Sequence, residues 1–374
     1  MFWLSACKDV LDEHTEIINA DNTIDVFQKL ATQPNLSKFS DYIRSTGYDK
    51  LLVSSQNYTV WAPTNDALAT LDASISADPA KLKDFVANHI ALTTIAAPKS
   101  SSDTLRVQLL NKKIATLIGK TFEEAGVTGN GQFVKNGAIY TIDKPVPTKL
   151  NVWEFMLSST DAPLQSNYIS NISTMVIDSA NATIIGYNNS GTPIYAPNPP
   201  MVSRNLYWTS VADLRTENQQ YTFFMLQDAA FSRETAKLTP YYAANDKLGL
   251  VSDFTVKGLY PVDKLPDTLL STRGVKIPLT KAAVVKSYRA SNGIVHVVSA
   301  LPFRIKDKVP TFKIEGELPF SFRTDRTGNT FYRTKLDNKG ILYKDIEVYD
   351  HSISEYYIRY VKSNVPTVKY KVYA

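Results

Sequence analysis

Cysteine and histidine are both scarce in this chain of 374 residues, and their scarcity removes several classes of site. The single cysteine, Cys7, excludes an internal disulfide and a cysteine-built zinc site. Four widely spaced histidines argue against a histidine-built metal centre, and they are His14, His89, His296 and His351. No run approaches eighteen apolar residues, which excludes a transmembrane helix. We expect no metal and no cofactor.

An excess of one charge sign is also lacking, since the net charge is only +5. Residues 306–374 hold 13 Lys and Arg against 9 Asp and Glu, so most of the positive excess lies there. This excess is too weak for the basic face that nucleic acid requires, and we expect no nucleic-acid partner. With 44% hydrophobic and 21% charged residues, the composition is typical of a folded soluble protein. The length suits two or three domains.

The first residues resemble a targeting signal. Leu4-Ser5-Ala6-Cys7 resembles a bacterial lipobox, and the acidic run that follows it resembles the export signal of surface lipoproteins of the Bacteroidota. The resemblance implies that Cys7 is lipidated and anchors the chain in the outer membrane at the cell surface. The alternatives are a free buried cysteine and an ordinary solvated linker. We expect residues 1–19 to be a lipobox remnant with an acidic export linker.

Residues 57–68 predict a strand, a turn and a helix. The segment reads Asn-Tyr-Thr-Val-Trp-Ala-Pro-Thr-Asn-Asp-Ala-Leu. Pro63 has no N–H to give a sheet, and Thr64, Asn65 or Asp66 can cap the following helix. An earlier helix has Asn22 or Thr23 as its expected N-cap. Apolar residues at helical spacing follow, namely Val26, Leu30, Phe39, Ile43 and Leu52.

These segments, with residues 82–90 and the Asn136-Gly137 turn before an alternating run, resemble the fasciclin (FAS1) domain. Tyr140 stands where the family usually has a histidine. The pattern returns more weakly in residues 152–157, 221–231, 250–258 and 291–298. The resemblance implies an α+β protein with a first FAS1 domain at 20–147 and a second at 151–305.

The second repeat contains a long polar insertion near residues 158–206. Long polar loops on a folded scaffold are frequent binding elements. A solvated extension or an extra hairpin is the favoured interpretation. If the insertion binds a partner, we expect its docking tip at Ile194, Tyr195 and Pro197.

Residues 306–374 change to a period-two pattern and predict an antiparallel β-sandwich or jelly-roll-like domain. Strands are expected at 311–316, 344–349, 355–361 and 368–373. Either the sheet closes at the last of these strands or the sequence ends inside the domain.

No motif of a catalytic site is present, so we expect no enzyme activity. His89 and His296 are expected to be satisfied core histidines. The leading hypothesis is a lipid-anchored cell-surface protein that uses FAS1 domains for adhesion or scaffolding. The alternative is an accessory subunit of a SusC/SusD-like TonB-dependent uptake complex that binds glycan or peptide. In that case exposed tyrosines would stack on sugar rings, with Tyr332, Tyr343 and Tyr357 as candidates.

Overall fold

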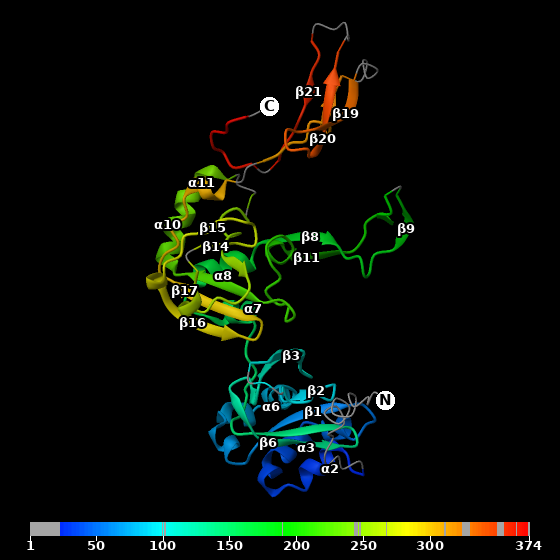
Figure 1. Cartoon of the computed structure of the whole chain (residues 1–374), viewed down its shortest axis with the longest axis vertical. Coiled ribbons are helices and arrows are strands. Elements are labelled where there is room, and N and C mark those ends of the chain that lie inside the picture. Colours follow the sequence, from blue (N-terminus) through cyan, green and yellow to red (C-terminus); the bar gives the residue numbers. More distant parts are fainter. Residues whose placement is uncertain are drawn as a thin grey trace, which may run out of the picture. The chain divides into compact units, whose positions relative to one another are not determined.

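A computed structural model describes residues 23–98, 100, 102–188, 190–242, 246, 248–266, 268–309, 312–323, 330–349, 355–363 and 365–372. Helices and sheets are mixed along the chain, as predicted (Figure 1). The chain divides into two compact units. The first comprises Met1–Ser158, Leu214–Thr222 and Tyr288–Val295, and the second comprises Ser159–Asp213, Phe223–Ser287 and His296–Ala374.

The first unit is built on a seven-stranded sheet with the order β2-β1-β7-β6-β5-β4-β3. β1 and β7 are parallel, and the other neighbouring strands are antiparallel. Every residue of β1 is buried, as expected for a strand covered on both faces. The strands are β1 (Tyr58–Pro63), β2 (Ile90–Ala91), β3 (Thr104–Gln108), β4 (Ile114–Ile118), β5 (Thr121–Phe122), β6 (Ala125–Val134) and β7 (Gly137–Ile142).

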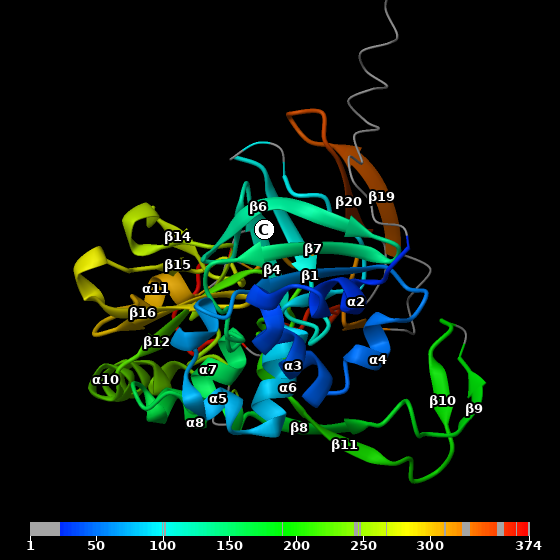
Figure 2. The same cartoon turned by 90° about the horizontal axis from the view of Figure 1, so that it is seen from below.

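Helices lie along one side of β1 and β7, as Figure 2 shows for α2, α3 and α6. The five apolar residues predicted for the opening helices are fully buried and join one core cluster. The helices are α2 (Val26–Ala31), α3 (Ser37–Ser45), α4 (Asp49–Leu52), α5 (Ala73–Ser76), α6 (Pro79–Ala87) and α7 (Val152–Ser158). Short 3₁₀ helices are η1 (Pro34–Leu36) and η2 (Ala67–Thr70).

Two capping predictions need correction or refinement. Asp25, not Thr23, caps α2, because its carboxylate accepts the Gln28 N–H while Gln28 accepts the Asp25 N–H. Asn22, the other predicted cap, lies outside the described residues. At η2 the N-cap position is occupied by Asp66, whose side chain makes no capping bond, while the hydroxyl of Thr64, another of the three predicted caps, accepts the Ala67 N–H at 3.0 Å.

A buried asparagine fixes the start of the first domain to its last strand. Asn136 Oδ1 accepts the Val26 N–H at 2.8 Å, and its amide donates to the carbonyls of Leu52 and Ser54 at 2.7 and 3.0 Å. The next residue, Gly137, packs so closely on β1 that a Cβ atom there would lie 2.0 Å from the Tyr58 carbonyl oxygen. The Asn-Gly pair predicted as a turn therefore also closes the domain.

Asn292 repeats this arrangement. Its Oδ1 accepts the Val152 N–H at 2.8 Å, and its amide donates to the carbonyls of Leu214 and Thr216 at 2.8 and 3.1 Å. A Cβ on Gly293 would lie 2.3 Å from the Tyr221 carbonyl oxygen. The same backbone groups are thus satisfied twice in one chain, once at the start of α2 and once at the start of α7.

A four-stranded sheet follows with the order β13-β12-β17-β16. It reproduces the β2-β1-β7-β6 order, with β12 (Tyr221–Leu226) in the place of β1 and β17 (Gly293–Val298) in the place of β7. The remaining strands are β13 (Thr255–Lys257) and β16 (Val284–Ala290), and a small sheet pairs β14 (Leu269–Leu270) with β15 (Lys276–Ile277).

The helices of the second unit include one inside the predicted insertion. Residues 163–170 are not a polar loop but helix α8, whose buried Gln165 donates to the Phe224 carbonyl at 2.9 Å. The others are α9 (Leu206–Ser210), α10 (Asp228–Leu238) and α11 (Ile305–Lys308), with 3₁₀ helices η3 (Thr239–Tyr241), η4 (Val262–Lys264) and η5 (Lys281–Ala283). A buried ion pair of 2.7 Å between Lys308 and Asp253 holds α11.

The predicted β-sandwich of residues 306–374 is not confirmed. In the described part, β18 (Ser321–Phe322) pairs with β21 (Ile358–Arg359), and β19 (Thr330–Leu336) pairs with β20 (Leu342–Val348). The strands predicted at 311–316 and 368–373 are wrong over their described residues, and only two residues of 355–361 form strand. Most side chains of these sheets remain exposed, so the alternating pattern did not signal a covered face.

Candidate functional site

A two-part β-arm, residues 171–205, projects from the second unit (Figure 1). Near the domain, β8 (Ser173–Ile177) pairs antiparallel with β11 (Met201–Asn205) in a regular register. Farther out, β9 (Ile184–Tyr187) pairs antiparallel with β10 (Pro193–Tyr195), with a bulge in β9. Both strand pairs form separate two-stranded sheets within the described chain. The favoured interpretation of the insertion, an extra hairpin, therefore fits residues 171–205.

The arm exposes more apolar surface than a solvated loop would. Met175, Ile185 and Tyr187 are 58%, 62% and 64% exposed, and five further large apolar side chains are also exposed, namely Ile177, Ile184, Ile194, Met201 and Val202. Only two charged residues, Asp178 and Arg204, occur in 171–205. Contiguous exposed apolar surface on a soluble domain is typical of an interaction site.

Ile194 and Tyr195 of the predicted docking tip lie in β10, and Pro197 follows that strand. Ile194 is exposed, Tyr195 is half-buried and Pro197 is exposed. The register places Tyr195 on the same face as Tyr187 and Ile184, whereas Ile194 lies on the opposite face beside Gly186. The three residues therefore share one strand end but do not form one surface.

Sequence reasoning missed the inner strand pair, in which Met175, Ile177 and Met201 share one face. Methionine side chains on exposed surfaces adapt their shape to different partners. The signal was present as the uncharged run Ser-Thr-Met-Val-Ile at 173–177, but the surrounding Asn and Pro residues suggested a loop.

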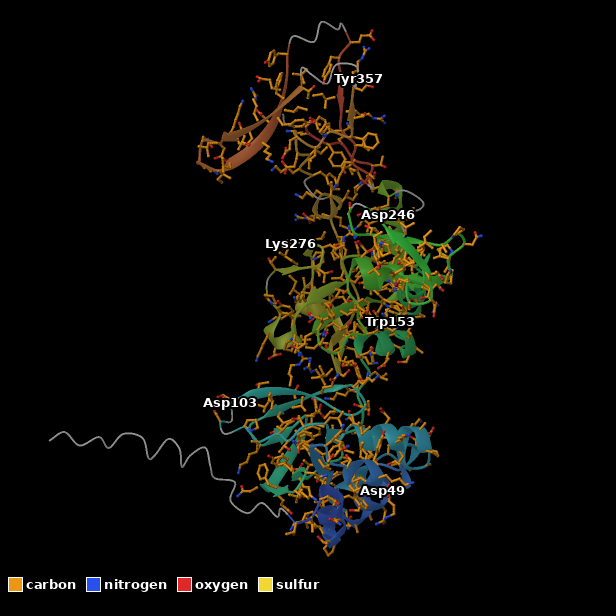
Figure 3. The ribbon with its side chains drawn as sticks, turned by 90° about the vertical axis from the view of Figure 1, so that its right-hand side faces the viewer. Asp49, Asp103, Trp153, Asp246, Lys276 and Tyr357 are labelled. Carbon is orange, nitrogen blue, oxygen red and sulfur yellow. The ribbon has the colours of Figure 1, made fainter. Side chains whose placement is uncertain are left out.

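The three tyrosines proposed for sugar stacking do not share a platform. The β19–β20 register puts Tyr332 opposite Ile346 and Tyr343 opposite Lys335, which places the two rings on opposite faces. Tyr357 precedes β21 in the other sheet and is exposed (Figure 3). The Tyr343 face also carries ion pairs of Asp345 with Arg333 and Lys335.

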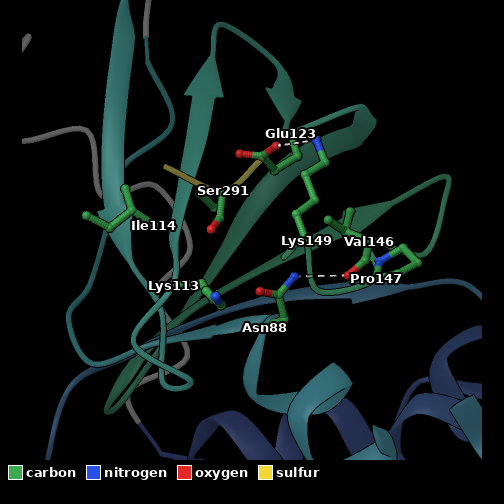
Figure 4. Close-up of a pocket in the computed structure, with 9 residues that line it drawn as sticks. Asn88, Lys113, Ile114, Glu123, Val146, Pro147, Lys149 and Ser291 are labelled. Atoms are coloured by element: carbon green, nitrogen blue, oxygen red, sulfur yellow. Dashed lines mark hydrogen bonds and ion pairs between the residues drawn. The ribbon is translucent and has the colours of Figure 1, made fainter. Parts of the chain in front are cut away.

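A polar pocket in the first unit contains two lysines, each neutralised by carboxylates (Figure 4). Lys149 Nζ lies 3.0 Å from Glu123, and Lys113 Nζ lies 2.7 and 2.9 Å from Glu154 and Glu217. Burial acts to lower the pKa of Lys113, but its hydrogen bonds to the two glutamates outweigh burial and raise that pKa. Because both ammonium groups are paired with carboxylates, the pocket offers no free positive charge to an anion. The Lys113 pairs also connect the segment before β4 to α7 and to Glu217.

His89 is a satisfied core histidine, as predicted. Its ring accepts the Val146 N–H at Nε2, so Nδ1 carries the proton and donates to the Phe85 carbonyl at 2.8 Å. Burial lowers the pKa of His89 to about 4. A neutral, fully bonded imidazole holds α6 and the end of the domain in place.

His296 is also buried and bonded, but one of its partners is a serine. Nε2 faces the Tyr260 carbonyl at 2.8 Å and must donate to it, so Nδ1 accepts the Ser287 hydroxyl at 2.7 Å. In the Ser-His-Asp arrangement a carboxylate orients the imidazole and stabilises its protonated form, and here a neutral carbonyl takes that place. Burial also lowers the pKa of His296, which opposes protonation of the ring.

Three further predictions concern Cys7, metal binding and membrane-spanning helices. Cys7 and the acidic run after it are outside the described residues. The described side chains include no cluster of three or more His, Cys, Asp or Glu that could hold a metal ion. Within the same ranges, no helix has the length and apolar character needed to cross a membrane.

Comparisons with known proteins bear mainly on the first domain. The family model of the fasciclin domain matches residues 34–147. The chain matches no curated protein. Among solved structures, it is similar to a FAS1 domain pair from the insect cell adhesion molecule fasciclin I. The match has 15% identity and a TM-score of 0.28, over 74% of this chain and 99% of that chain. The match to the family model shows that the chain contains a fasciclin domain at residues 34–147.

Proposed function

We propose that this chain is a non-catalytic interaction protein in which fasciclin-type domains carry a protruding docking arm. Fasciclin domains are associated with cell adhesion and interaction. The observation that carries the proposal is the arm at 171–205, whose apolar side chains are exposed and whose charge is nearly absent. Covering such an apolar surface with a partner removes it from water, which lowers the free energy of the complex.

The proposal includes a second fasciclin-type domain at 151–305. Two features support it: the repeated hydrogen bonds of Asn136 and Asn292, and the repeated strand order of the two sheets. The arm is inserted near the front of this second domain. Because a compact domain holds both ends of the arm, partners would meet the arm rather than the core.

We further propose that Cys7 anchors the chain to the outer membrane through lipid. The lipobox-like sequence before Cys7 supports this. In cell fractionation, the Cys7→Ser variant is expected to leave the membrane fraction for the soluble fraction. If Cys7→Ser stays with the membrane after a salt wash, the anchor is wrong.

The arm's role can be tested by excising it. Ser173 and Asn205 are directly paired across the arm's base, so residues 174–204 can be replaced by Asn-Gly, which closes a two-residue hairpin. A matched variant removes only 178–200 and joins the paired residues Ile177 and Met201 in the same way. Full removal is expected to abolish cross-linking to partners on intact cells while near-ultraviolet circular dichroism stays unchanged. Undiminished cross-linking would contradict the docking role.

The uptake-complex alternative makes a different prediction. Under it, the chain co-purifies with a SusC/SusD-like transporter from native membranes and binds glycan through its C-terminal tyrosines. The separation of Tyr332 and Tyr343 onto opposite faces weighs against one stacking platform. A glycan array with the full chain, compared with its Tyr332→Ala and Tyr343→Ala variants, distinguishes the two functions. Glycan binding that both variants reduce would favour uptake.

A further inference from the structure

The four strands of the arm differ in how their outer edges are protected. Exposed edge strands invite unwanted pairing, and proteins block them with bulges, prolines and charges. β9 carries a bulge, and β10 begins at Pro193. β11 follows Pro199-Pro200 and contains Arg204. β8, with the sequence Ser-Thr-Met-Val-Ile, has none of these devices within its bounds. The carboxylate of Asp178, which follows it, is bonded to the Ala180 N–H and the Asn181 amide.

The outer edge of β8 presents regularly spaced backbone groups. On the inner side, the Leu206 N–H donates to the Ile172 carbonyl and the Asp178 N–H donates to the Pro200 carbonyl, both at 2.8 Å. In an antiparallel pair, alternate residues bond to the neighbouring strand. The backbone groups of Ser173, Met175 and Ile177 therefore point away from β11.

We propose that this edge pairs with β8 of a second copy of the chain, antiparallel and centred on Met175. This inference rests on the proposed function, and it names the partner of the arm. In this register Met175 faces Met175 of the second copy, and Ser173 faces Ile177 of the second copy. The outward backbone groups of both strands then satisfy one another, and the two-fold axis passes between the two Met175 residues.

Side-chain chemistry favours a second copy as the occupant. β8 carries no charge, so two identical strands meet without repulsion. Thr174 faces Val176 of the second copy in this register, a pair of β-branched residues that suits a sheet. The Met175, Ile177 and Met201 face of each copy also becomes continuous across the new four-stranded sheet. A charged peptide would find no opposite charge on β8 to pair with.

The contact is small, so pairing in dilute solution is expected to be weak. A stable interface usually buries at least about 1,200 Å², and five-residue strands bury much less. Molecules held on a surface meet at high effective concentration, which compensates for weak pairing. Sedimentation velocity of the full chain is expected to show a dimer fraction that grows with concentration.

Disulfide trapping tests the register. All variants carry Cys7→Ser, so that the introduced cysteine is alone. In the proposed dimer the two Met175 Cα atoms lie about 5.5 Å apart, within disulfide range. The matched control is Ser203→Cys, which lies directly opposite Met175 on the same face but on β11. Three strand spacings separate the two Ser203 residues of the dimer, about 14 Å, which is too far.

We expect mild oxidation to link Met175→Cys chains at least about ten-fold faster than Ser203→Cys chains, because only the former are held within disulfide range. Equal rates would mean that random collision alone links them, and would overturn the proposal. So would the absence of any linked dimer from Met175→Cys.

Charge reversal tests whether the partner is the same strand. Added to Met175→Cys, the pair Ser173→Lys and Ile177→Lys places like charges opposite each other twice per dimer. The pair Ser173→Lys and Ile177→Glu places opposite charges there instead. The double-lysine variant is expected to link at least about five-fold more slowly than the lysine–glutamate variant at low salt. If both link equally, the strand pairs differently and the proposed register is wrong.

These results are distinguishable from a failure of the proposed function. If Met175→Cys does not link but arm excision still abolishes partner cross-linking on cells, the arm docks another protein and only this inference fails. If arm excision changes nothing on cells, the docking function itself fails.

Discussion

The two repeats of this chain use one solution for their backbone and different residues for their loops. Asn136 and Asn292 make matching hydrogen bonds at 2.8 Å to the first helix of their repeats. The fourth residue of β7 is Tyr140, and the fourth residue of the matching strand β17 is His296. The Tyr140 hydroxyl bonds to Ile95 and Ala97 in the loop after β2, and His296 bonds to Tyr260 in the loop after β13. Position and task are kept, while the side chain differs.

The largest effect is expected where a side chain cannot fit. Gly137→Ala and Gly293→Ala place a Cβ 2.0 and 2.3 Å from a carbonyl oxygen of the neighbouring strand. Each is expected to lower the free energy of unfolding by more than about 3 kcal/mol. Gly186→Ala is the control, because nothing lies within 4 Å of its Cβ position. Urea unfolding measures the stability of all three variants. If only one of Gly137→Ala and Gly293→Ala lowers the free energy of unfolding, the two repeats are not equivalent at this position.

The next effect concerns the asparagines themselves. Asn136→Ala or Asn292→Ala leaves one N–H and two carbonyl groups without their partners in a buried site. We expect a loss of about 3 kcal/mol for each, seen as a lower urea midpoint. Aspartate at either position keeps the acceptor but sets a carboxylate oxygen against two carbonyl oxygens, so it should recover little of the loss. Full recovery would show that the donated bonds contribute nothing.

The histidines predict a pH dependence. Because the pKa of folded His89 is about 4 and that of an unfolded histidine is about 6.5, the unfolded state binds more protons between these values. The free energy of unfolding is therefore highest above pH 6.5 and falls toward pH 4. His89 should account for about 2 kcal/mol between pH 7 and pH 5. The His89→Gln variant should lose this part of the slope, and an unchanged slope would contradict the assignment.

The smallest effect is expected from the loop contact. Tyr140→Phe removes one donated and one accepted hydrogen bond, and should cost about 1 kcal/mol. Exchange of the Ala97 amide proton should accelerate at the same time. Tyr187→Phe, on the exposed arm, is the matched control with an expected change near zero. Equal results for both would mean that Tyr140 does not hold its loop.

Local chemistry made the first domain predictable. The Asn136-Gly137 turn, the strand that ends at Pro63 and the buried helix positions all follow from backbone geometry and helical spacing. The arm was harder to predict, because its strands are short and exposed on both faces. Their sequences therefore lack the alternation that marks a half-buried strand. The unprotected edge of β8 depends on which strands pair within the arm. The residue pattern of one strand does not reveal its pairing partner.

The C-terminal region shows the opposite error. Its sequence alternates strongly, and β20 forms as expected near residues 344–349, paired with β19, which was not predicted. Alternation indicates that two faces differ, but it does not say what covers the apolar one. Phe331, Leu336 and Leu342 remain exposed, so the pattern predicted a packed sandwich that the described residues do not form.

The Asn136 contact also has a mechanical meaning. It ties the entry of the first domain, at Val26, to the start of β7, while the chain leaves the domain from the other end of that strand. Tension between entry and exit would therefore act along β7. Six residue pairs join β7 to β1 in parallel, from Tyr58–Gly137 to Pro63–Ile142. Under such a load the β7 backbone and the Val26–Asn136 hydrogen bond carry the force first, and the β1–β7 pairs are loaded only after that bond breaks.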